Sequence, residues 1–148
     1  MIIGVISSIL AAMIIYLART QLRILVNFIL SGVYPRIEGR YKLEFDETLM
    51  AEPTEETFFE LQQLGPIIRG IGKTYKDNKI TSEDIVRGKI TATRVLIFNF
   101  ETITEAHHNI GAGLFRLSAT GSEMSGYLSY ICVQCQGAGA MEAKLIKT

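Results

Sequence analysis

The first 18 residues, MIIGVISSILAAMIIYLA, carry no charge and only three hydroxyl side chains. A helix that is apolar on every side must be covered by lipid or by other protein. Eighteen residues at about 1.5 Å rise span roughly 27 Å, close to the ~30 Å hydrocarbon core of a bilayer. The run therefore predicts a transmembrane helix at the start of the chain.

Two other interpretations of this run are disfavoured. A cleaved signal peptide has basic residues before its apolar core, whereas here the apolar residues begin at Ile2. A buried core helix would need more protein around it than a small barrel provides. The first positive charges, Arg19 and Arg23, follow the run, and the positive-inside rule then predicts a single-pass protein with its C-terminal part in the cytoplasm.

Residues 19–32 continue the helical pattern. Arg19 and Arg23 share one face, and an apolar stripe lies beside them. We expect the same helix to leave the bilayer here and to stop at Gly32. The stripe packs either on the rest of the chain or on other copies of itself. Residues 1–32 are thus predicted to be a transmembrane helix with a juxtamembrane extension, and 33–148 a β-barrel ligand-binding domain.

From Val33 onward, apolar and polar residues alternate in short runs separated by turn-forming residues, which is typical of strands. Turns are expected at 52–54, 76–79, 105–109, 120–122 and 136–137. Eight strands with tight connections predict an antiparallel up-and-down β-barrel. The predicted strands are 37–46, 57–64, 66–76, 85–93, 95–102, 111–119, 123–133 and 138–147.

A glycine followed two positions later by a large apolar residue recurs along these strands, for example at Gly88 and Ile90, Gly113 and Phe115, and Gly126 and Leu128. Alternation predicts that these glycines point into the barrel. Inward glycines let strands coil sharply enough to close a small barrel, and they also leave room for a ligand. Both explanations stay open.

The predicted inward face is mainly apolar, with Tyr41, Gln63 and Tyr130 as polar exceptions. Buried polar groups need partners. We expect these three side chains to bond one another, the backbone or a bound molecule.

Charges are balanced overall, at 15 basic and 15 acidic residues, but they are segregated along the chain. Residues 44–60 hold seven acids and no base, whereas 69–94 hold seven bases and three acids. This composition argues against binding to DNA or RNA polymers, yet the basic stretch leaves room for a local anion site.

The two cysteines, Cys132 and Cys135, have the spacing of half a zinc knuckle or of a thioredoxin motif. No second ligand pair and no βαβ unit accompany them, so we expect two free thiols.

No catalytic constellation is evident. His107 and His108 are adjacent in a predicted loop without an acid or nucleophile at motif spacing, and phosphate-loop and metal-helix motifs are missing. We expect a binding protein rather than an enzyme, with no cofactor and no metal.

The layout resembles a known family. An apolar helix followed by a minimal barrel, with IEGRY at 37–41 and FFELQQLGPIIRG at 58–70, resembles the transmembrane β-barrel effectors of bacterial anti-phage signalling, of the CD-NTase-associated CBASS or Panoptes type. The resemblance implies a bacterial inner-membrane protein that binds a cyclic dinucleotide in its barrel. It also implies self-assembly through the membrane helix and disruption of the membrane. Better-known members have two membrane helices, whereas this chain is predicted to have one.

A cyclic dinucleotide presents two phosphates and two bases, and so needs cations and aromatic faces. The candidates are Tyr75 and Tyr130 for stacking and Arg69 and Arg116 for phosphate, although alternation places both arginines outward. The polar inward residues Tyr41 and Gln63 complete the predicted site.

Two other functions remain open. A tethered lipocalin-like barrel would bind an apolar small molecule and would lack a phosphate partner inside. A purely structural anchor would dock another protein through the acidic stretch at 44–60.

Overall fold

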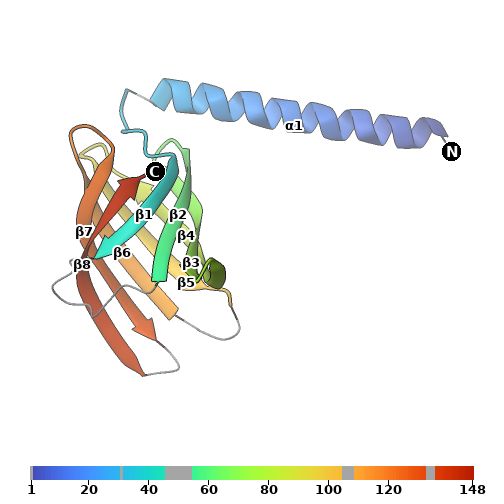
Figure 1. Ribbon diagram of the computed structural model, residues 1–148. Helices are drawn as coiled ribbons and strands as arrows, with labels where there is room; N and C mark the ends of the chain where they lie inside the picture. The colour runs from blue at the N-terminus through green and yellow to red at the C-terminus, as the bar shows by residue number, and fades with distance from the viewer. Residues whose placement is uncertain (1, 31, 46–54, 105–108, 133–135) are drawn as a thin grey trace.

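The computed structural model describes residues 2–30, 32–45, 55–104, 109–132 and 136–148 (Figure 1). Within these residues a single helix precedes a run of strands. The elements are α1 (Ile2–Leu30), β1 (Gly39–Phe45), β2 (Glu55–Leu64), β3 (Ile67–Lys76), β4 (Lys79–Ile90), β5 (Val95–Thr102), β6 (Asn109–Leu117), β7 (Glu123–Cys132) and β8 (Gly137–Lys147).

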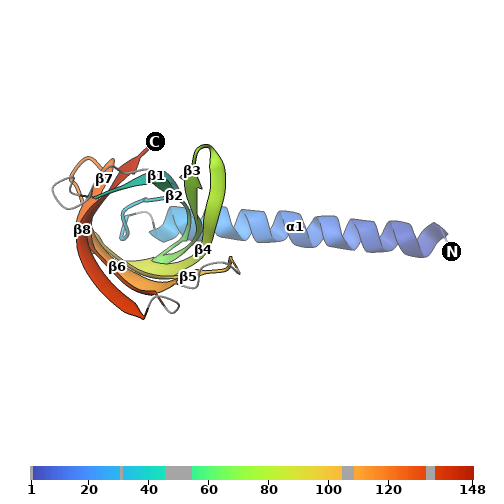
Figure 2. The same ribbon diagram turned by 60° about the horizontal axis from the view of Figure 1, so that its bottom comes forward.

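The strands form a closed barrel in the order β1 to β8, in which each strand pairs antiparallel with the next and β8 pairs with β1. Figure 2 shows the strands curving around a common interior. Closure pairs the first and last strands and so removes the free edges with which strands of other chains could pair. The predicted mainly β fold, an eight-stranded antiparallel up-and-down barrel, is confirmed.

The β3–β4 hairpin shows how local sequence sets the register. Asp77 and Asn78 form its turn with φ of 51° and 61°, and these two residue types tolerate positive φ. The predicted strand at 85–93 is wrong at both ends. Pairing with β3 carries β4 back to Lys79, because pairing outweighs the weak strand propensity of the polar residues before Ile85. At the other end, β4 stops at Ile90 and a turn follows in which Arg94 has φ 66°.

The neighbouring strand fills the space at the inward glycines, with backbone carbonyls nearest at Gly88 and Gly126 and with aromatic rings at others. A Cβ on Gly113 would lie 2.6 Å from the Phe98 ring, and one on Gly111 would lie 2.3 Å from the Phe100 ring. Phe98 in turn stacks on Phe115 at 5.7 Å between centroids. The space that these glycines leave is therefore filled by protein, which favours barrel closure as their role.

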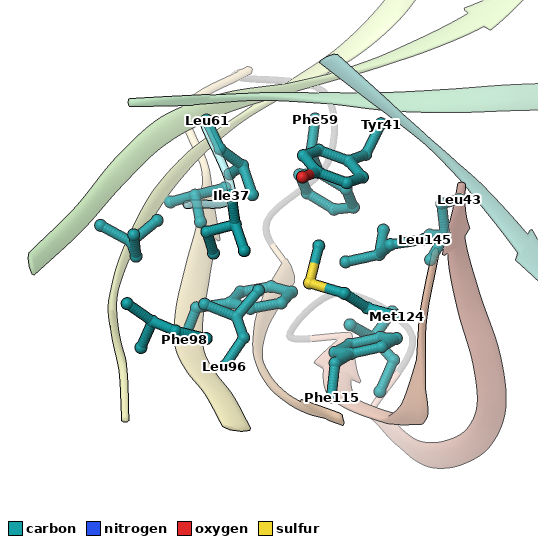
Figure 3. Close-up of a cluster of buried hydrophobic side chains, with 14 of the residues drawn as sticks. Ile37, Tyr41, Leu43, Phe59, Leu61, Leu96, Phe98, Phe115, Met124 and Leu145 are labelled. Carbon is teal, nitrogen blue, oxygen red and sulfur yellow. The ribbon is translucent and has the colours of Figure 1, made fainter. Parts of the chain in front are cut away.

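The core runs through the barrel and combines these rings with aliphatic side chains from every strand (Figure 3). It also includes one residue that precedes β1. The fully buried apolar side chains are Ile37, Tyr41, Ile68, Leu96, Phe115 and Leu145.

The helix α1 passes beside one end of the barrel, next to β2, and projects far from it (Figures 1 and 2). Its large apolar side chains from Leu10 to Leu17 are between 50 and 70 % exposed. The predicted helix is confirmed over Ile2–Leu30. The assignment of α1 as a transmembrane span is not confirmed, since no helix among the described residues is both long enough and apolar enough to cross a membrane.

The prediction of free thiols is wrong for Cys132, which is disulfide-bonded. The chain has one other cysteine, Cys135, which lies outside the described residues. The predicted turn at 52–54, the loop residues 105–108 with both histidines, and most of the acidic stretch at 44–60 also lie outside them.

Candidate functional site

An inward-facing row of cross-strand partners carries polar groups through the barrel interior. It runs from Tyr41 on β1 through Phe59, Gly72 and Asp84 to Thr102 on β5. We call these five residues the polar row. Its four side chains are all buried, so the row faces the barrel interior.

The acid of this row is paired with a hydroxyl. Thr102 Oγ1 donates a hydrogen bond to Asp84 Oδ1 at 2.6 Å. Burial raises the pKa of the Asp84 carboxyl, and the hydrogen bond from Thr102 opposes that rise. A carboxylate with one bond made keeps further acceptor sites, and a carboxylic acid can also donate. Asp84 can therefore bind amino or imino groups of a ligand.

Tyr41 lies at the other end of the row, beside Phe59 (Figure 3). Its side chain is fully buried, and its hydroxyl has no hydrogen-bond partner among the described residues. Burial raises the pKa of Tyr41 to about 12. Buried hydroxyls in native proteins are almost always bonded, so this one is available to a bound molecule or a water.

Tyr130 of β7 is half-buried and packs against the core. Its ring covers Gly139, whose added Cβ would lie 2.9 Å from the ring. Its cross-strand partner on β6 is Gly111, which lies under Phe100. Tyr130 thus presents an aromatic surface in the half of the barrel away from α1.

Gln63, the third predicted inward polar residue, is used by the fold. Its amide nitrogen donates to the carbonyls of Pro35 and Gly65 at 3.0 and 2.8 Å, and its Oε1 accepts from the Ile37 amide at 2.8 Å. These bonds fasten the segment between α1 and β1 across the barrel end, with Ile37 fully buried beneath it. Gln63 is a structural clamp.

Arg94 closes the same end of the barrel. Its guanidinium donates to the carbonyls of Ser118 and Ala119 at 2.6 and 3.1 Å, which joins the β4–β5 turn to the β6–β7 turn. The helix end, as we call the barrel end with Ile37, Gln63 and Arg94, is therefore held by backbone-directed bonds.

The remaining predicted site residues point outward. Arg69 and Arg116 are exposed, as alternation predicts. Tyr75 packs edge-on against Phe58 on the outer surface, at 5.9 Å between ring centroids. The structure thus brings Tyr41 and Tyr130 to the interior, uses Gln63 as a clamp, and places Arg69, Tyr75 and Arg116 on the outer surface.

The site predicted from the sequence did not include Asp84 or Thr102. The predicted strand began at Ile85, one residue too late to include Asp84. Alternation back from the buried Val86 would have placed Asp84 inward, opposite Thr102.

On the outer surface, the charges that are segregated in sequence meet across strands. Lys42 bonds Glu56 at 2.8 Å, Lys73 lies 3.9 Å from Glu83, and Lys144 lies 3.6 Å from Glu123. Within the basic stretch at 69–94, the ion pairs of the described residues include Lys73, whose partner Glu83 belongs to the same stretch. The cross-strand partners of Arg69 are Gln62 and Arg87.

No protein-family model, curated protein or solved structure matches this chain.

Proposed function

We propose that this chain is a membrane-associated receptor and effector of anti-phage defence, in which ligand bound inside the barrel controls the helix. The observation that carries this proposal is the helix end. The segment that follows α1 is built into the barrel, with Ile37 buried in its core and Pro35 and Ile37 held by Gln63. We propose that a change in the barrel interior reaches α1 through this connection, which is packed and hydrogen-bonded at Pro35 and Ile37.

The proposed ligand is a cyclic dinucleotide, bound rather than turned over. Tyr130 would stack on a base, and Asp84 with Thr102 would bind the amino groups of a base edge. Tyr41 would offer its unpartnered hydroxyl. For the phosphates, Lys76 and Lys79 face each other across the β3–β4 hairpin, at the barrel end away from α1. Two like charges directly opposite are unfavourable on their own, and Lys76 has Glu55 as its partner on β2.

The helix would act at the bacterial inner membrane. Its exposed apolar side chains from Leu10 to Leu17 lie before Arg19, the first charge in the chain, and others, from Leu22 to Ile29, lie after it. We propose that the residues before Arg19 enter the lipid, that Arg19 stays at the headgroups with the barrel on the cytoplasmic side, and that copies of α1 associate to disrupt the bilayer.

A second candidate is a tethered barrel that binds an apolar small molecule. The polar row supports it, because its charged group is a carboxyl and none of its members is a cation. A phosphate placed beside ionised Asp84 would be repelled. The two candidates differ in salt dependence, since an anionic ligand is released as salt rises and an apolar one is not.

Calorimetric titration of the full chain in detergent with cyclic dinucleotides tests the ligand. We expect one of them to bind and Tyr130→Ala to weaken it by about five- to 150-fold, the range for one lost base stack of about 1 to 3 kcal/mol. Tyr127→Ala is the matched control, because Tyr127 is an exposed outward tyrosine on the same strand. Absence of binding, or equal losses in both variants, would reject the proposed site.

Dye release from vesicles tests the coupling. Gln63→Leu removes two hydrogen bonds to the connecting segment and one to Gly65, so we expect the ligand to lose its effect on leakage while still binding. Leakage that responds to ligand equally in the variant and the wild type would contradict transmission through the helix end.

A further inference from the structure

A surface groove of about 440 Å³ lies between α1 and the β2–β3 hairpin. The helix contributes Arg19 and Leu22, and the hairpin contributes Arg69 with apolar side chains beside it. Leu22, Leu64 and Ile67 are 61, 40 and 49 % exposed, so an apolar strip lies in the groove next to two arginines. The groove is therefore amphipathic, with cations and an apolar wall.

Arg69 is one of the bases on β1 to β4 that lie opposite another base. Arg40 faces Glu60 and Lys73 faces Glu83, whereas Lys76 faces Lys79 but has Glu55 as its partner on β2. Arg69 instead lies directly opposite Arg87, an arrangement that is unfavourable on its own. None of the ion pairs that the structure shows in the described residues includes Arg19, Arg69 or Arg87. This cationic site has no acidic partner within the described barrel surface.

We propose that the groove binds an anionic phospholipid, with its phosphate between Arg19 and Arg69 and an acyl chain along Leu22, Leu64 and Ile67. Arginine is suited to phosphate because it donates paired hydrogen bonds in one plane. The apolar strip favours a lipid over a free phosphate, which would leave these side chains in water. The inference rests on the proposed membrane association of α1 and adds the lipid class and its site.

The position of the groove along α1 agrees with this occupant. The uncharged part of α1 ends immediately before Arg19, and Arg19 lines the groove. If the preceding residues enter lipid, the groove lies at the level of the headgroups. The outward position of Arg69, which removes it from the barrel interior, places it where a headgroup can reach it.

The test measures binding of the full chain to vesicles of phosphatidylcholine alone and of phosphatidylcholine mixed with phosphatidylglycerol, at one ionic strength. We expect preference for the anionic vesicles, and we expect Arg69→Gln to reduce that preference about fivefold, the effect of one basic residue at an anionic surface. Arg116→Gln is the matched control, since Arg116 is exposed on β6 and outside the groove. It should leave the preference unchanged.

Each other outcome rejects the inference. Equal reductions in the two variants would indicate a diffuse electrostatic effect, and an unchanged preference in Arg69→Gln would remove the groove as a site. Calorimetric binding of glycerol 3-phosphate that depends on Arg69 would indicate a free phosphate ligand instead. Equal binding of the wild-type chain to neutral and anionic vesicles would overturn the lipid site alone. Failure of the wild-type chain to bind either kind of vesicle would overturn the proposed membrane association as well.

Discussion

The helix end and the polar row both place polar groups inside the barrel, but they satisfy them differently. At the helix end, Gln63 bonds three backbone groups and Arg94 bonds two carbonyls, while the buried Arg94 Nε has no partner among the described residues. In the polar row, the described residues give Asp84 one side-chain partner, Thr102, and give the Tyr41 hydroxyl none.

This difference separates a structural region from a binding region. Buried polar groups that bond the backbone, as the Gln63 amide and the Arg94 Nη2 do, hold the fold and have little left to offer a ligand. Groups that are buried with partners still missing reduce stability, and such groups collect at functional sites. We therefore assign the helix end to connection with α1 and the polar row to ligand binding.

The largest expected effect is at the helix end. Ile37→Ala should lower the free energy of unfolding by about 2 to 5 kcal/mol, because it opens a cavity beneath the connecting segment. Urea unfolding followed by circular dichroism measures this. The control is Ile80→Ala at the opposite end, where the side chain is 49 % exposed and the loss should stay within about 0.5 kcal/mol. Similar losses in the two variants would remove the distinction between a packed end and an open one.

Most of this architecture could be predicted from the sequence. Alternation, turn residues and recurrent glycines gave the barrel, and the same alternation placed Tyr41 and Gln63 inward and Arg69 outward. Those signals are local, because each depends on residues two to four positions apart.

What could not be predicted depends on contacts between distant segments. Nothing near Gln63 in sequence indicates that it bonds Pro35 and Ile37, and nothing near Arg69 indicates that Arg19 lies across a groove from it. Asp84 was missed for a local reason, since its polar neighbours obscured the start of β4. The glycines were correctly placed, but only the neighbouring strands show that their space is filled.

A pH experiment sharpens the comparison at the polar row. The pKa of Asp84 is raised by burial, so between its unfolded value of about 4 and its folded value the folded chain binds more protons than the unfolded chain. Stability should therefore fall as pH rises through that window. Asp84→Asn cannot ionise, so its stability relative to the wild type should increase from acid to neutral pH. If the difference in free energy of unfolding between Asp84→Asn and the wild type stays constant across this pH range in urea titrations, burial does not raise the pKa of Asp84.

The smallest expected effect on stability belongs to Tyr41→Phe. The Tyr41 hydroxyl has no partner among the described residues, so its removal should leave the free energy of unfolding within about 0.5 kcal/mol of wild type or raise it. A loss of 1 kcal/mol or more in the free energy of unfolding would reveal a bound partner, such as a water, and would place Tyr41 with Gln63 among the satisfied groups.

If the hydroxyl serves the ligand, the same variant should weaken binding by about 0.5 to 1.5 kcal/mol while the stability of the empty barrel is kept. Calorimetric titration beside urea unfolding of one preparation separates these outcomes, because a structural hydroxyl changes stability and a ligand-binding hydroxyl changes affinity alone.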